Sequence, residues 1–303
     1  MRKKKYIICT PNLDFTSGGS IVLNYFCHLL RQIGESSFIW PEYLGSNKER
    51  FWKRYRRRLK KDIFANNLYN NAPEWGSSEY APFTDEILVY PETIFGNQWN
   101  AKNIVRWIMA IPGQNTDGRF KFNDNELIIG YGKECNTPMY PITDKNDIKV
   151  IYNMDDVYYQ TNFNKRKKTC YMIRKARWLD KNKNKMLDSH DSTAICIDGK
   201  THQEVAKIFN ECDKFICYDT YTYFSTFATK CGCTSIVIPD EGVSKEDWKP
   251  NVKDTYGIAY GLDDVEYAIE TKDKFLEYQK EIEQNNINAV KKFVKLCEKY
   301  FIE

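Results

Sequence analysis

The sequence contains no apolar run of about 20 residues, the length that a helix needs to cross a bilayer. Its first residues, MRKKKYIICTPN, hold an apolar stretch that is too short for a secretory signal. We therefore expect a cytoplasmic protein. The net charge of +4 over 303 residues is also too small to indicate a nucleic-acid partner by itself.

Closely spaced metal ligands are scarce as well. There are only three histidines, and the ten cysteines are scattered through segments with strand and helix patterns. The one close pair is Cys231 and Cys233. In a chain without an export signal, this distribution predicts reduced, mostly buried thiols and no zinc site.

What is present is an alternation of strand and helix patterns, which is typical of α/β folds with parallel sheets. The first half reads as the strand YIICT, a glycine loop, the helix GSIVLNYFCHLLRQIG and the strand SSFIWP, and then the strand EILVYPE, a helix in NAKNIVRWIMAIPG and the strand NELIIGYG. Prolines in the segment 138–147 indicate a hinge. The alternation resumes from IKVIYN to TSIVIP and is followed by a charged helical tail over 264–301. We expect two Rossmann-like domains, 1–142 and 143–303, that face one another across a cleft.

Glycines mark the start of the first helix. Gly18 and Gly19 would let a ligand approach the helix N-terminus, where unpaired N–H groups favour anions. The spacing does not match the dinucleotide fingerprint, and a plain tight turn explains the pair equally well.

The stretch DKFICYDTYTYFSTFATKCGCTSIVIPD reads as a strand, a helix from Tyr221 to Cys231 and a second strand. Polar side chains follow the first strand, where open parallel sheets bind ligands. They are Asp219, Thr220, Tyr221, Thr222 and Ser225. Such groups can bond sugar or phosphate oxygens, although Asp and Thr are also ordinary helix N-caps.

Four segments carry a family resemblance: SGGSIVLNYFCHLL, VYPETIFGNQWNAKNIVRWIMAIPG, TCYMIRKARW, and YDTYTYFSTFATKCGCTSIVIPD running into SKEDW. Together they resemble GT-B-type glycosyltransferases of bacterial capsule and O-antigen synthesis. The resemblance implies a sugar-nucleotide donor site in the C-terminal half and a saccharide acceptor site in the N-terminal half. Retaining members carry two glutamates at positions that correspond to Asp219 and Phe227 here. The second is therefore missing, so both retaining and inverting mechanisms stay open.

The same resemblance implies that Arg174 and Lys175 bind the donor diphosphate. The surrounding segment is rich in Lys and Arg, so the two residues could also belong to a solvated face. An Asp-any-Asp motif, usual in metal-dependent transferases, is absent, so we expect no metal, and we expect no other cofactor. Further candidates for donor contact are His190, in the loop DSHDST, and the pair Gly18 and Gly19.

An inverting reaction needs a base that deprotonates the acceptor hydroxyl. Asp14, in the loop before the glycines, and Glu92, at the end of LVYPE, are the candidates. Glu92 could instead have a structural role in which it bonds the loop TIFGN. His28 falls near the apolar face of a helix, where packing is the usual role.

The segment NKERFWKRYRRRLKK, residues 47–61, places an aromatic stripe on a strongly basic helix. This composition suits an anionic membrane surface and therefore a lipid-linked acceptor. Binding to nucleic acid, or a solvated helix whose stripe packs on the core, would give the same pattern. Two other functions also remain open for the chain: transfer of a phospho-group to capsule sugar, and binding without catalysis.

Overall fold

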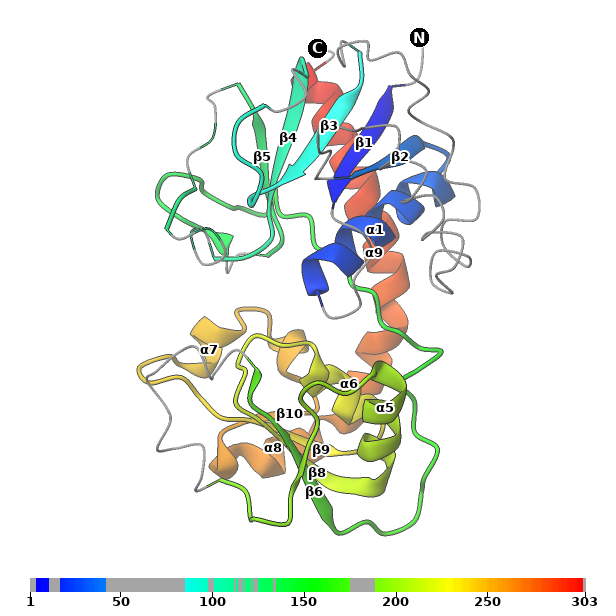
Figure 1. The fold of residues 1–303 in the computed structure, drawn as a ribbon, viewed down its shortest axis with the longest axis vertical. Coiled ribbons are helices and arrows are strands. Elements are labelled where there is room, and N and C mark those ends of the chain that lie inside the picture. Colours follow the sequence, from blue (N-terminus) through cyan, green and yellow to red (C-terminus); the bar gives the residue numbers. More distant parts are fainter. Residues whose placement is uncertain are drawn as a thin grey trace. The chain divides into compact units, whose positions relative to one another are not determined.

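The computed structural model describes residues 4–10, 17–41, 85–97, 101–111, 113, 116, 118–120, 122, 125–132, 135–174 and 189–301. The chain divides into two compact units. Unit 1 comprises Met1–Tyr152 together with Glu283–Glu303, and unit 2 comprises Asn153–Ile282. Each unit is described separately below (Figure 1).

Unit 1 is built on a parallel five-stranded sheet with the order β2-β1-β3-β4-β5. Its strands are β1 (Lys5–Thr10), β2 (Ser36–Pro41), β3 (Ile87–Pro91), β4 (Asn103–Ile108) and β5 (Leu127–Gly130). All residues of β3 and β4 are buried, as is usual for central parallel strands covered on both faces.

Two helices pack on one face of this sheet (Figure 1). They are α1 (Gly18–Gln32) and the C-terminal part of α9 (Lys272–Phe301). Phe293 of α9 lies with its ring centroid 5.6 Å from that of Tyr6 and 4.9 Å from that of Phe26. Gly34 has a φ of 87°, and its N–H donates to Arg31 O beyond the end of α1, as its predicted role of helix stop requires.

Unit 2 repeats the topology with the order β10-β9-β8-β6-β7, also parallel. Its strands are β6 (Lys168–Met172), β7 (Ile195–Cys196), β8 (Cys212–Cys217), β9 (Thr234–Val237) and β10 (Ile258–Tyr260). Its helices are α5 (His202–Glu211), α6 (Phe224–Lys230), α7 (Lys245–Trp248), α8 (Val265–Glu270) and the start of α9, with the 3₁₀ turns η4 (Val252–Thr255) and η5 (Leu262–Asp264).

Renumbered within its own unit, each sheet has the strand order 2-1-3-4-5, one of the common doubly wound arrangements. The protein is therefore an α/β protein with two Rossmann-like units, and this part of the predicted fold class is confirmed. Among the described helices, none is long and apolar enough to cross a membrane. All ten cysteines are free thiols, and nine of them are buried, as expected.

Three predicted elements differ from the structure. The helix predicted in residues 100–113 is instead β4, because Ile104, Val105 and Ile108 are buried on both faces of the sheet. A strand buried on both faces lacks the alternation that distinguishes it from a buried helix. The strand predicted at 148–153 is absent, and only an isolated bridge, Gly130–Asp147, precedes this segment. Helix α6 begins at Phe224 rather than at Tyr221.

The division of the chain also differs from the predicted boundary at 142. Unit 1 continues to Tyr152 and also includes Glu283–Glu303 at the end of the chain. The reason is that the Asn286 side chain accepts a hydrogen bond from Ile151 N (2.8 Å) and donates one to Ile151 O (2.8 Å). These bonds and the burial of Phe293 attach the end of α9 to the first sheet.

Candidate functional site

The strand order places a topological switch point in each sheet, and ligands of doubly wound folds bind at the carboxyl ends of the strands there. In unit 1 the switch lies between β1 and β3, and in unit 2 between β6 and β8. Predicted site residues follow strands at both points. Glu92 follows β3, Arg174 follows β6, and Asp219 follows β8.

Arg174 has an unusual backbone conformation. Its φ is 34°, in the left-handed region that residues with a Cβ rarely adopt. The Asp198 carboxylate, just beyond β7, accepts hydrogen bonds from Ile173 N (3.2 Å) and Arg174 N (3.0 Å) and so stabilises this turn. The Arg174 guanidinium carbon lies 5.6 Å from the centre of the Phe224 ring. A residue with a strained backbone that neighbouring groups hold in place is a feature of functional sites.

His190 contacts one side chain of β6 and one that directly follows β8. Its ring stacks on Tyr171 of β6 with a centroid distance of 3.9 Å, and its Nδ1 lies 2.7 Å from the hydroxyl oxygen of Tyr218. Tyr218 directly follows β8 and is buried. The predicted donor contact His190 is thus near Tyr171 and Tyr218, at the same end of the sheet as Arg174. We call the group Arg174, His190, Asp198, Tyr218 and Asp219 the β6–β8 site.

The segment after β8 is held mostly by internal contacts. Asp219 and Thr220 are buried, and Thr220 Oγ1 donates to Asp240 Oδ2 (2.8 Å), beyond β9. Trp248 Nε1 donates to Thr220 O at 2.7 Å. These contacts hold the backbone next to Asp219 in place.

Of the other predicted hydroxyl groups, two make internal contacts and one is exposed to solvent. Thr222 Oγ1 accepts a bond from Phe224 N (3.4 Å) at the start of α6, and Ser225 is buried beside the Cys217 thiol. Burial raises the pKa of the Cys217 thiol, and the negative charge of Asp219 raises it further. Tyr221 is 43% exposed and is the one of the predicted group that presents a large surface to solvent.

Asp219 does not cap α6. The N-cap of this helix is Tyr223, which makes no side-chain capping bond, and Asp219 lies four positions earlier in the chain. The capping alternative for Asp219 is therefore wrong, because the chain makes a turn at Thr220 and Tyr221 before the helix begins.

The predicted anion site of unit 1 lies at the start of α1, and the structure describes it from Ser17 onwards. Ser17 caps the helix by accepting a bond from Ser20 N (3.3 Å). A Cβ added at Gly18 or Gly19 would meet no atom within 4 Å, so the described neighbours do not require glycine there. Thr10 Oγ1, at the end of β1, is buried and has no hydrogen-bond partner among the described residues. Asp14, Lys175 and the basic segment 47–61 lie outside the described residues.

Glu92 is buried and accepts a bond from Met109 N (3.0 Å), which ties the end of β3 to the end of β4. This contact favours a structural role for Glu92, in which it holds the backbone of Met109. The loop TIFGN is held by Arg106 of β4, which donates to Ile94 O and to Gly96 O (3.1 Å). Arg106 is itself paired with the buried Glu126 at 2.7 Å.

Sequence reasoning missed several residues near these strand ends. Asp198 follows the apolar strand TAICI, so the rule that found Asp219 could have found it too. His202, the first residue of α5, lies with its Nδ1 2.6 Å from the Tyr158 hydroxyl oxygen, and its ring is parallel to Phe224 at 5.5 Å. No sequence pattern indicates that contact. Within the described ranges, no group of three or more His, Cys, Asp or Glu side chains could hold a metal ion.

Comparison of the sequence with models of known protein families found no match, and comparison with curated proteins found no significant match. The functional interpretation therefore depends on the fold class, the arrangement of side chains and the resemblance of the four sequence segments.

Proposed function

We propose that the protein is a GT-B-type glycosyltransferase that transfers a sugar from a nucleotide-sugar donor to a saccharide acceptor in bacterial surface polysaccharide synthesis. The observation that carries the proposal is the β6–β8 site: a strained arginine, a buried acid and ordered aromatic side chains at the switch point of a Rossmann-like sheet. The resemblance of four sequence segments to such enzymes gives this site its chemical interpretation.

In the proposed reaction an acceptor hydroxyl oxygen attacks the anomeric carbon of the donor sugar, and the bond from that carbon to the diphosphate breaks. Negative charge then grows on the leaving diphosphate. Arg174 supplies a permanent cation for it, and guanidinium groups form strong bonds with phosphate oxygens. Asp219 accepts hydrogen bonds from donor hydroxyl groups. The hydroxyl of the half-exposed Tyr221 adds a neutral hydrogen-bonding group.

The acceptor proton needs a base if the reaction inverts the anomeric centre. Glu92 is bound to Met109 N and buried, which leaves Asp14 as the better candidate. The acceptor is proposed to be lipid-linked, with the basic segment 47–61 close to an anionic membrane surface. No metal or additional cofactor is proposed.

The test is thermal unfolding with UDP-, GDP-, CMP- and TDP-sugars. A ligand at a hundred times its Kd stabilises the folded state by about 2.7 kcal/mol, which raises the melting temperature by several degrees. We expect stabilisation by one nucleotide class in the native protein and in a Lys207→Ala control, and weaker stabilisation in Arg174→Ala. No response to any nucleotide sugar would contradict the proposal. It would favour transfer of another group or binding without catalysis.

A further inference from the structure

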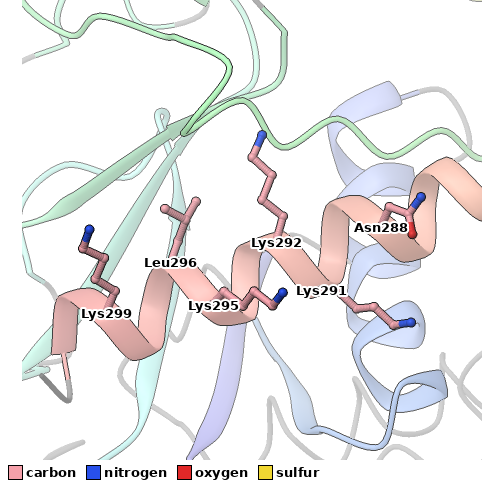
Figure 2. A pocket seen from close by; sticks show the side chains of 6 residues that line it. All are labelled: Asn288, Lys291, Lys292, Lys295, Leu296 and Lys299. Atoms are coloured by element: carbon pink, nitrogen blue, oxygen red, sulfur yellow. The ribbon is translucent and has the colours of Figure 1, made fainter.

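The last turns of α9 carry a lysine-rich surface that the proposed function does not use. A shallow basin of about 450 Å³ lies along this part of the helix (Figure 2). It is lined by Asn288, Lys291, Lys292, Lys295, Leu296 and Lys299. We call these six residues the α9 lysine face.

The charges of this face are not neutralised locally. Lys291, Lys295 and Lys299 are exposed, and no ion pair in the described part of the chain includes them. Lys292 donates to a backbone carbonyl, Asp147 O, at 2.7 Å. Between residues 288 and 299 the one acidic residue is Glu298. The face therefore has a clear excess of positive charge.

The fold does not require these lysines. Cations stabilise the C-terminal end of a helix, but this effect falls off within the last turn. Lys291 and Lys295 precede the last turn of a helix that ends at Phe301. Lysines four residues apart also repel one another on a helix surface. Attachment to the sheet comes from the opposite side of the helix, where Val290, Phe293 and Cys297 are buried.

Two partly exposed hydrophobic side chains lie beside the cationic row. Leu296 and Tyr300 are four residues apart, next to the row Lys291, Lys295 and Lys299. Tyr300 is 48% exposed, while its hydroxyl donates to Glu126 O at 3.4 Å. Flexible lysines next to half-exposed apolar groups match a surface with diffuse negative charge and an apolar interior.

We propose that the α9 lysine face binds the anionic phospholipid surface of a membrane. Lysine is a point charge on a flexible stem and lacks the fork geometry that selects a single phosphate group. Several lysines in a row therefore suit many lipid headgroups better than one small anion. This inference does not depend on the glycosyltransferase proposal, and it concerns a surface separate from the segment 47–61.

The experiment measures sedimentation of the full chain with vesicles of phosphatidylcholine, with and without phosphatidylglycerol. The test variant is Lys291→Gln, Lys295→Gln and Lys299→Gln together, which spares the bonded Lys292. The matched control replaces Lys207, Lys214 and Lys280, which are also exposed, by Gln. The native chain and the control should bind the anionic vesicles, less strongly at high salt. The test variant should bind about a hundredfold more weakly, at about fivefold per lysine.

Three outcomes would overturn this proposal: a native chain that does not prefer anionic vesicles, a test variant that binds them as tightly as the native chain, or equal losses in both variants. If the test variant bound vesicles like the native chain but no longer bound a soluble polyphosphate, the ligand of the face would be a soluble polyanion instead. Circular dichroism and the melting temperature should be near native in both variants, since the substituted side chains are exposed.

Discussion

The left-handed backbone of Arg174 allows stability and binding to be separated with two substitutions. Arg174→Ala and Arg174→Gly both remove the guanidinium and its contact with Phe224, so both lose the same side-chain interactions. They differ in the backbone, because alanine keeps its Cβ at a φ of 34° whereas glycine adopts this conformation freely. The left-handed conformation costs residues with a Cβ about 1–2 kcal/mol.

We therefore expect Arg174→Gly to be more stable than Arg174→Ala by about 1 kcal/mol, or about 3–5 °C in melting temperature. Loss of the cation–π contact should lower the stability of both variants by about 0.5–1 kcal/mol. The glycine variant should thus melt near the native protein or slightly above it.

Nucleotide binding, unlike stability, should change by the same amount in both variants. One charge-assisted bond to the diphosphate contributes about 1.5–3 kcal/mol, so both variants should bind the nucleotide about 10- to 100-fold more weakly than the native protein. Calorimetric titration with the nucleotide diphosphate and thermal unfolding without ligand measure the two effects separately. Equal melting temperatures for the two variants would refute the strain argument. Native affinity in either variant would remove Arg174 from the donor site.

Four further predictions concern the remaining candidate residues and the metal. Asp219→Asn should lower turnover about tenfold to a hundredfold, equivalent to about 1.4–2.7 kcal/mol, with little change in melting temperature; native turnover would exclude a donor contact. Gly19→Ala should stabilise the protein against urea by up to about 1 kcal/mol, because the added Cβ meets no neighbour, while it weakens nucleotide binding; unchanged binding would make the glycine pair a plain turn. Arg106→Met should cost about 3–5 kcal/mol of unfolding free energy by leaving Glu126 buried and unpaired, and adding Glu126→Gln should restore part of it; no recovery in the double variant would argue against this cause. Finally, EDTA should leave glycosyl transfer unchanged, and activity restored by Mn²⁺ or Mg²⁺ after its loss on chelation would disprove the metal-free mechanism.

The succession of most strands and helices follows from local sequence. Apolar runs such as YIICT and FICY, separated by helical periodicity and glycine stops, predict a parallel α/β fold because such strands are buried on both faces. The apolar run ends where the strand leaves the sheet. The polar side chains that follow it therefore lie at the carboxyl end of the strand. Asp219 and Arg174 were predictable in this way.

Other features depend on contacts between distant segments. β4 resembles a helix in sequence and becomes a strand because β3 and β5 pair with it on both sides. The return of residues 283–303 to unit 1 depends on Asn286 binding Ile151 and on Phe293 packing against Tyr6. The left-handed turn at Arg174 needs Asp198, which lies 24 residues later in the chain. Local sequence determines which segments can form strands and helices, whereas these partners are brought together only when the sheets assemble.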